Sequence, residues 1–508
     1  MYRAGIGEYN DSSAGMGPID FIFVSTYLLN FEFLLDEVPE LLSLPRACVV
    51  YGAKEGTEDA WRQACTTLEG QCSVDFLCRD PSAPKKSANN PLKNTIPYGV
   101  HHTKMFLVGY ASGTLRVVIH TANLRFADIH HKAQGAYIQD FPRKSTSNNN
   151  SQEELSSEFE TDLITYMDTY GYNQKYVWDE VSSASPKGRA TTLSEHLRKY
   201  DFSSAAAILI PSTPGYHKLD NCKVGHLKLR HEIAQLGSEH QEKQKVNKFA
   251  SSGPVVCQFS SIGSVTKKYL HRLFYSMDIG RSRGNRVTTA GSNHNTKEED
   301  DETKPLHLQL VYPTSDEICD SVEGYRGGAS VPGHSKNVSK DFLQPLFRKW
   351  SSSKSFLASL SLSKQDDDST NTNPLWKGIN VPHIKTYFQL NSHKDEEEGI
   401  EWFLLTSHNL SKAAWGDVQN SSQFGEKRLF IRHWELGVLI TPSRLGAQRL
   451  VPWSKKRDTA SKTITGDVTI PLPYRHKPLA YTKKDKAWAV DQRYVRLDVF
   501  GRRSAGDA

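Results

Sequence analysis

The chain has 508 residues, which is too long for one ordinary hydrophobic core, so we expect two domains. Hydrophobic residues make up 37% of it, enough to build packed domains, and the mean hydropathy of -0.55 argues against a membrane protein. The 63 basic and 57 acidic residues give a net charge of +6, which permits nucleic-acid binding but equally suits an ordinary protein with a slightly positive surface.

The first long apolar region, Phe21–Leu35, contains polar residues at positions 25, 26, 30 and 32, which predicts a core strand or helix rather than a membrane span. The residues before it contain no apolar stretch typical of a signal peptide, so secretion is not expected. The seven cysteines are scattered and form no Cys-x-x-Cys pair. This pattern predicts neither a zinc ribbon nor a disulfide framework and fits a reducing compartment.

Farther along, strand-like apolar runs alternate with helical stretches, which indicates an α/β fold. Three polar segments, 144–158, 281–304 and 361–373, are typical of surface insertions or disordered loops. The apolar run Ala205–Ile210 ends in a Pro-Ser-Thr-Pro-Gly turn, which predicts a domain boundary near Pro211–Gly215. We therefore expect an N-terminal domain of residues 1–211 and a C-terminal domain of residues 212–508.

An internal repeat relates the two expected domains. Each copy begins with His-x-Lys, continues through a strand-like run and ends in Thr/Ser-x-Asn-Leu. The first copy contributes His102, Lys104 and Asn123, and the second contributes His383, Lys385 and Asn409. One His-x-Lys is a common accident on a polar strand edge. Two copies with the same continuation indicate two halves of one site.

These residue types suit phosphate chemistry. Alternate residues of a strand point to one face, so each His-x-Lys would place an imidazole beside an ammonium group. Two lysines and two asparagine amides converging on one point would hold the oxygens of a phosphate. One imidazole could then attack phosphorus while the other protonates the departing oxygen. The lysines would supply the charge that Mg²⁺ supplies elsewhere, and no metal-ligand cluster accompanies the repeat, so no cofactor or metal is expected.

Longer strings around these residues resemble the tyrosyl-DNA phosphodiesterases, a branch of the phospholipase D superfamily. The similarity runs from about Tyr27 to Trp488. Most of the superfamily carries an Asp shortly after His-x-Lys and a Gly-Ser before the Asn, and the absence of both is the pattern of the tyrosyl-DNA branch. The matching strings are Tyr98–Met105 (YGVHHTKM), Val118–Leu124 (VIHTANL), Gln258–Ser264 (QFSSIGS), Pro382–Tyr387 (PHIKTY), Asn409–Gly416 (NLSKAAWG), Trp434–Val438 (WELGV) and Pro471–Tyr474 (PLPY).

The resemblance implies a fold and an activity. The fold would consist of two similar α-β-α sandwich domains, related by a pseudo-two-fold axis and sharing one active site. The enzyme would repair DNA by hydrolysing the bond between a DNA 3′-phosphate and a tyrosine or another 3′ adduct, leaving a 3′-phosphate. His102 would be the nucleophile that forms a phosphohistidine, and His383 the acid and then the base. Lys104, Lys385, Asn123 and Asn409 would bind the phosphoryl oxygens.

The resemblance also implies that Glu435 and Gln134 orient the two histidines through their far ring nitrogens. Glu435 has physical support of its own, because a carboxylate beside the apolar run Leu436–Ile440 is costly to bury unless it is paired. The alternative is a charge at a strand edge that faces water.

Further positions match the substrate contacts of the family. Ser260, Ser261, Ser411 and Lys412 would contact DNA phosphates, and Tyr98 would stack on a base, which tolerates any sequence. Backbone N–H groups at the start of a helix at Ser411 could hold a phosphate, although Ser411 could equally be only a helix cap and Tyr98 a core aromatic. Tyr27 and Trp488 resemble residues on the peptide side.

The expected partners are DNA with blocked 3′ ends, single-stranded or as frayed duplex, and a topoisomerase-derived peptide adduct. No membrane partner is expected, and a monomer suffices because one chain carries both half-sites. The family implies a nuclear location, for which the short basic runs at 455–457 and 483–484 are only weak support. The alternatives are a superfamily nuclease or lipase with the same two-histidine chemistry, or a protein that only binds DNA ends.

Overall fold

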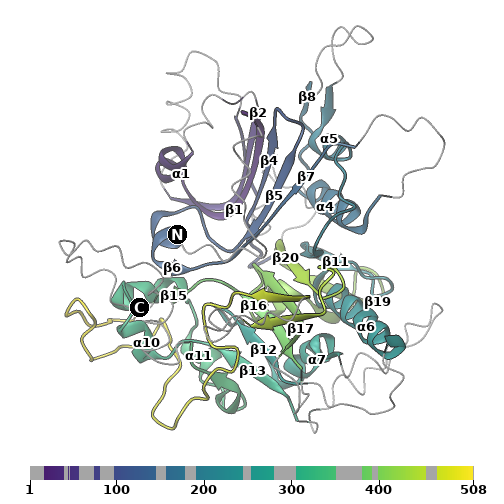
Figure 1. The fold of residues 1–508 in the computed structure, drawn as a ribbon. Helices are drawn as coiled ribbons and strands as arrows, with labels where there is room; N and C mark the ends of the chain where they lie inside the picture. Colours follow the sequence, from purple (N-terminus) through teal and green to yellow (C-terminus); the bar gives the residue numbers. More distant parts are fainter. Residues whose placement is uncertain are drawn as a thin grey trace, which may run out of the picture.

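Two β-sheets stacked on each other form the centre of the protein (Figure 1). The computed structural model describes residues 17–38, 44, 46–55, 74–79, 96–144, 156–177, 190–243, 253–279, 302, 305–350, 380–391, 399–452 and 466–506. The predicted polar insertions fall almost entirely outside these residues. Among the described helices, none is long and apolar enough to cross a membrane.

The first sheet has the strand order β3-β2-β1-β4-β5-β7. Its first three strands in the chain run parallel to one another, and the other three continue the sheet in antiparallel fashion. The strands are β1 (Ile19–Asn30), β2 (Arg46–Glu55), β3 (Val74–Cys78), β4 (Met105–Tyr110), β5 (Leu115–His120) and β7 (Ala136–Phe141).

The second sheet has the order β10-β20-β17-β16-β12-β13-β14, with β21 and β22 joined at β17. Its parallel part comprises β12, β13 and β14, and the remaining pairs of the main order are antiparallel. The strands are β10 (Ile208–Ser212), β12 (Val255–Gln258), β13 (Leu308–Val311), β14 (Phe347–Arg348), β16 (Thr386–Leu390), β17 (Ile400–Thr406), β20 (Glu435–Ile440), β21 (Arg449–Pro452) and β22 (Asp467–Ile470).

The two sheets repeat the same design. Reading both from the parallel edge, β3-β2-β1-β4-β5-β7 matches β14-β13-β12-β16-β17-β20 in strand order, chain order and direction. The repeated motif occupies the same place in each, before the fourth strand and after the fifth. The prediction of two similar halves is confirmed by this topology.

Helices cover the outer faces of the pair of sheets and also help to fill the layer between them. Helix α1 (Phe31–Glu37) packs on one face of the first sheet. Helices α4 (Glu158–Asp168) and α5 (Leu193–Leu197) belong to the core that both sheets share, and α6 (Gly225–Lys243) and α7 (Lys267–Met277) pack on the far face of the second sheet. Polar caps set where these helices begin; Ser157 accepts a hydrogen bond from the backbone N–H of Glu160, and Thr266 from that of Tyr269.

Short elements complete the described chain. They are α3 (Phe126–His130), β6 (Lys132–Ala133), β8 (Lys175–Val177), β9 (Ala190–Thr192), β11 (Gly215–His217), α10 (Ser315–Cys319), η3 (Gly324–Ser330), α11 (Ser335–Val338), η4 (Gln344–Leu346), β15 (Val381–Pro382), α13 (Lys412–Trp415), β18 (Asp417–Ser421) and β19 (Glu426–Ile431).

The predicted domain boundary needs a small correction. A division between residues 211 and 212 would cut β10, whose residues Ile208–Ser212 all pair with β20 in the second sheet. The Pro-Ser-Thr-Pro-Gly turn therefore follows the first strand of the C-terminal half instead of preceding it. The pairing places the change between halves before Ile208.

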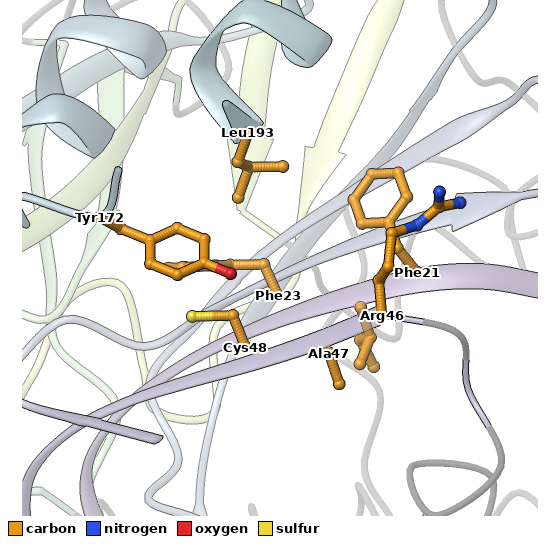
Figure 2. A pocket seen from close by; sticks show the side chains of 8 residues that line it. Phe21, Phe23, Arg46, Ala47, Cys48, Tyr172 and Leu193 are labelled. Carbon is orange, nitrogen blue, oxygen red and sulfur yellow. The ribbon is translucent and has the colours of Figure 1, made fainter. Parts of the chain in front are cut away.

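A small pocket beside the first sheet is not the predicted site. Figure 2 shows Phe21 and Phe23 of β1 and Cys48 of β2 beneath Leu193 of α5, with Tyr172 at one side. None of the predicted site residues lines this pocket. Burial raises the pKa of the Cys48 thiol, so this pocket is a gap in apolar packing with an unreactive thiol.

A buried ion cluster joins the two halves. The ammonium group of Lys228 on α6 is fully buried and lies 2.5 Å from Glu158 and 3.1 Å from Asp162, both on α4, and 2.9 Å from Glu232. Burial alone would lower the pKa of Lys228, but the three carboxylates raise it above its usual value. The lysine therefore stays charged and compensates several buried negative charges.

Replacing this lysine should destabilise the fold. Lys228→Met leaves the carboxylates uncompensated, and we expect the free energy of unfolding to fall by about 3 kcal/mol. Lys223→Met is the matched control, because Lys223 is 57% exposed and lies 4.0 Å from the same Glu158. Chemical denaturation of both variants beside the wild type would measure the difference. Equal effects of the two substitutions would contradict the structural role of Lys228.

Candidate active site

The repeated motif lies at corresponding strand ends of the two sheets. The Asn residues follow β5 and β17 as predicted. The His-x-Lys segments, however, lie immediately before β4 and β16, not on the strands themselves. The strand pattern of the sequence continues through these segments, but their histidines form backbone hydrogen bonds to the other half of the molecule.

Backbone hydrogen bonds cross between the halves at both His-x-Lys segments. The N–H of His102 donates to the carbonyl of Trp434 at 2.9 Å, and the N–H of His383 donates to the carbonyl of Ala133 at 3.0 Å. Trp434 and Ala133 directly precede Glu435 and Gln134. The two crossings are equivalent. Each half therefore brings its own histidine to a residue of the other half, His102 to Glu435 and His383 to Gln134.

The two lysines are buried close to the imidazoles. Lys104 and Lys385 are 1% and 0% exposed, and each ammonium group donates to the carbonyl of its own histidine at 2.5 Å. Burial lowers the pKa of Lys104 to about 7 and that of Lys385 well below its usual value, in the latter case aided by the nearby Lys104. Such crowding of cationic groups is unfavourable without a counter-charge, so the site suits an anion.

His102 is held by a carboxylate. Its Nδ1 lies 2.8 Å from Oε2 of Glu435, which is buried. Burial lowers the pKa of His102 to about 4, whereas Glu435 raises it in part. Burial alone would raise the pKa of Glu435, but the neighbouring imidazoles hold it well below its usual range. A neutral imidazole therefore donates its Nδ1–H to an ionised carboxylate, which leaves the Nε2 lone pair free for a nucleophilic role.

His383 is held by an amide. Its Nδ1 lies 3.3 Å from Oε1 of Gln134, and that oxygen also accepts a 2.7 Å hydrogen bond from the Thr121 hydroxyl. The Gln134 Nε2 group donates to the carbonyl of Asp128 at 2.9 Å, which fixes the orientation of the amide. Burial and then the charge of Lys385 lower the pKa of His383 well below its usual value. Gln134, unlike Glu435, carries no charge that would raise the pKa of its histidine, so His383 should be the better proton donor once it is protonated.

The asparagines are also oriented by hydrogen bonds. The Asn409 Oδ1 atom accepts from the backbone N–H groups of Ser261 at 2.9 Å and Ser260 at 3.2 Å. Its amide nitrogen has no acceptor among the described residues and can donate to a ligand. Asn123 accepts from the N–H of Leu28 at 3.3 Å and donates to the Asp128 carboxylate at 3.1 Å.

The residues predicted to contact DNA differ in their exposure and in whether their polar groups already have partners. Tyr98 is 86% exposed and adopts a left-handed backbone with φ of 59°, so it is not a core aromatic. Ser411 is the N-cap of α13, as the alternative reading allowed, and Lys412 donates to Asp417 at 2.8 Å. The backbone N–H groups of Ser260 and Ser261 are occupied by Asn409, so these residues position the amide.

The two residues predicted for the peptide side lie in different places. The ring of Tyr27 lies 5.5 Å from that of His102, within the site. The indole of Trp488 is only 2% exposed; it donates to the carbonyl of Val331 at 3.1 Å and stacks on Tyr494. This burial corrects the expectation for Trp488, because a ring enclosed in the C-terminal core is not available to a peptide.

Two further residues of the site were not predicted. The buried carboxylate of Asp128 lies 3.6 Å from the Nδ1 atom of His383, and burial raises its pKa. His433 lies 3.3 Å from Oε1 of Glu435. Alternate residues of an extended chain share a side, so the spacing of His433 and Glu435 was a signal for the second residue. No comparable pattern marks Asp128.

Two histidines, two lysines and two asparagines thus converge from equivalent strand ends of a duplicated fold. The surroundings favour an anion, and one imidazole is oriented by a carboxylate and the other by an amide. These features define a two-histidine phosphodiesterase with a phospholipase D-like fold.

Comparisons with known proteins agree with this class. The family model described as tyrosyl-DNA phosphodiesterase matches residues 15–482. Tyrosyl-DNA phosphodiesterase 1 of Arabidopsis thaliana is 30% identical, covering 96% of this chain and 72% of that protein, and a probable tyrosyl-DNA phosphodiesterase of Caenorhabditis elegans is 29% identical, covering 96% and 85%. The crystal structure of the yeast tyrosyl-DNA phosphodiesterase shares the fold with a TM-score of 0.60 at 15% identity, covering 94% of this chain and 95% of that chain. The chain belongs to the tyrosyl-DNA phosphodiesterase family and is a hydrolase of phosphodiester bonds.

The Glu435 contact generates a test of the first chemical step. Glu435→Gln removes the charge that supports the basicity of His102, so covalent attack should slow by ~10- to 100-fold. Rapid-quench measurement of protein–DNA adduct formation would detect this. Gln134→Glu is the contrasting variant, because it acts on His383 and should leave attack by His102 less affected. An adduct that forms at the wild-type rate in Glu435→Gln would contradict the role of the carboxylate.

The lowered pKa values generate a second test. A bound phosphate anion should raise the pKa of Lys104 from about 7 and those of His383 and Lys385 from their depressed values, so binding near neutral pH should take up protons. Calorimetric titration with a 3′-phosphate oligonucleotide in buffers of different ionisation enthalpy would measure the uptake. Lys104→Met should reduce it. A binding enthalpy independent of buffer would contradict this account of the site.

Proposed function

We propose that the enzyme hydrolyses the bond between a DNA 3′-phosphate and a tyrosine through a phosphohistidine at His102. The Nε2 atom of His102 attacks phosphorus, and the bond from phosphorus to the tyrosyl oxygen breaks. His383 donates its Nε2 proton to that oxygen. His383 then removes a proton from water, which attacks phosphorus and releases His102 and the DNA 3′-phosphate.

The observation that carries this proposal is the unequal pair Glu435 and Gln134. The two residues occupy equivalent positions of the repeat, yet one presents a carboxylate to His102 and the other an amide to His383. A symmetrical site would provide two interchangeable histidines. The unequal partners support a division in which His102 is the nucleophile and His383 the proton carrier.

The bound phosphoryl group raises the pKa of His383 and so supplies the protonated acid that the first step needs. Lys104, Lys385, Asn123 and Asn409 hold the phosphoryl oxygens in this scheme. The proposed substrate is a single-stranded or frayed 3′ end carrying a tyrosyl peptide derived from a topoisomerase. One chain supplies both half-sites, which supports a monomer as the active form.

The first test uses a 3′-phosphotyrosyl oligonucleotide in excess EDTA, with product analysis on a gel. The expected product is the 3′-phosphate oligonucleotide. Activity only after addition of Mg²⁺ would overturn the proposed mechanism. Hydrolysis of internal bonds or of phospholipid vesicles at comparable rates would favour the nuclease or lipase alternative, and binding without turnover would favour a protein that binds DNA ends.

The two histidines should fail at different steps. His383→Ala should retain part of the first step, because a tyrosyl oxygen is a good leaving group, and should accumulate covalent protein–DNA. His102→Ala should form no adduct and no product. Denaturing gels of both variants beside the wild type would separate the cases. If no trapped species forms in His383→Ala under any condition, the division of labour is wrong.

A further inference from the structure

A small sheet outside the two main sheets carries a row of aromatic and arginine side chains. The sheet has the order β11-β19-β18. Its inner side is apolar, since Leu429 and Ile431 are fully buried and pack with Leu227 at the start of α6. Residues of β19 that alternate with these point outward. With neighbours from β11 and the turn before β19 they form the aromatic–arginine face, which consists of Tyr216, Phe424, Arg428, Phe430 and Arg432.

The members of this face stack in two connected groups. The guanidinium of Arg428 lies 3.8 Å from the centroid of the Phe424 ring, and that of Arg432 lies 5.0 Å from the centroid of the Phe430 ring. Tyr216 stacks on Phe430 with centroids 4.5 Å apart and lies 6.1 Å from Phe424. The Phe424 ring is 42% exposed. Glu426 pairs with Arg428 at 2.6 Å but has no such contact with Arg432 among the described residues.

One end of the face is attached to the loop that carries Tyr98. Arg432 donates to the carbonyl of Pro97 at 2.6 Å, and the Nε2 atom of His433 lies 3.3 Å from the carbonyl oxygen of Tyr98. The Tyr98 side chain itself projects into solvent. A strand that leaves the phosphate site past Tyr98 would therefore meet Arg432 next.

The other edge of the face is attached to Lys412. Phe430 pairs in register with Asp417 of β18, and Asp417 accepts the 2.8 Å hydrogen bond from the Lys412 ammonium group. The end of the face that Phe430 and Arg432 form thus lies near both Tyr98 and Lys412, the two exposed groups predicted to contact DNA.

We infer that the aromatic–arginine face binds single-stranded DNA beyond the nucleotides at the catalytic site. Sequence-independent sites for single strands combine aromatic rings, on which bases stack, with cationic groups that follow the phosphates. Arginine serves both purposes because its planar guanidinium stacks and forms paired hydrogen bonds to phosphate. The six residues of β19 extend for about 20 Å, which is long enough for more than one nucleotide. The direction of the bound strand, with its 3′-phosphate at the catalytic site and its other nucleotides on the aromatic–arginine face, rests on the proposed function.

The test compares short and long DNA strands. The double variant Phe424→Ala with Arg428→Gln removes an exposed ring and the guanidinium that stacks on it, without touching the catalytic residues. Loss of one stacked base is worth about 1–3 kcal/mol, so we expect the Kd of a 3′-phosphate oligonucleotide of about 14 nucleotides to rise roughly 10-fold. The Kd of one of about 4 nucleotides should change less than 2-fold on the same grounds. Fluorescence anisotropy measures both.

Lys427→Gln is the matched control, because Lys427 is an exposed cation of the same strand whose side chain points to the opposite side. It should leave both Kd values unchanged. Steady-state kinetics should show a raised KM on the long 3′-phosphotyrosyl strand, with kcat and turnover of the short strand retained, which also shows that the double variant is folded.

Equal effects on both lengths, or no effect on the long strand, would overturn the inference. Failure of the wild type to hydrolyse tyrosyl substrates would defeat the proposed function alone, because the anisotropy measurement does not depend on turnover.

Discussion

The active site depends on the two places where the chain of one half forms backbone hydrogen bonds with the other. The backbone N–H of His102 donates to Trp434, which precedes Glu435, and that of His383 donates to Ala133, which precedes Gln134. These bonds hold the imidazoles within hydrogen-bond distance of Glu435 and Gln134. Neither half alone contains a histidine together with its partner, so the two halves must be assembled before either histidine is oriented.

Assembly places several like charges in a buried space. Lys104 and Lys385 are almost inaccessible to solvent. Both lower the pKa of His383, and Lys104 also lowers the pKa of Lys385. This arrangement is unfavourable in the free enzyme and becomes favourable when a phosphate arrives. The bound anion therefore supplies the counter-charge, and it raises the pKa values of the buried groups so that they can take up a proton from solution. The stabilising ion cluster around Lys228, which connects α6 to α4, lies elsewhere and holds the halves together independently of the ligand.

The chemical core of the site could be predicted because its signal is local. His-x-Lys and the following Asn keep the same relation in both copies, and a duplicated sheet brings equivalent positions together. Contacts between distant segments left weaker signals. The ring of Trp488 is buried against Gly328, Val331 and Tyr494, and none of these three residues belongs to a matching motif string. The boundary near residue 211 was placed too late because the turn at its end is a local feature, whereas membership of β10 in the second sheet depends on pairing with β20.

Departures from the internal symmetry give the site a direction. The isolated bridges Leu29 to Leu124 and Ile262 to Leu410 are equivalent in the repeat. Tyr27 stands two residues before Leu29, and Ser260 stands two residues before Ile262. The first half therefore has an aromatic ring where the second half has a small polar group. Directly after Leu124 come Arg125 and the exposed Phe126. Directly after Leu410, the equivalent positions hold Ser411 and Lys412.

At these equivalent positions the second half therefore has hydroxyl and ammonium groups, whereas the first half has the rings of Tyr27 and Phe126 and the guanidinium of Arg125. The two duplicated halves have thus diverged at equivalent positions, and the two sides of the site differ in charge and in shape.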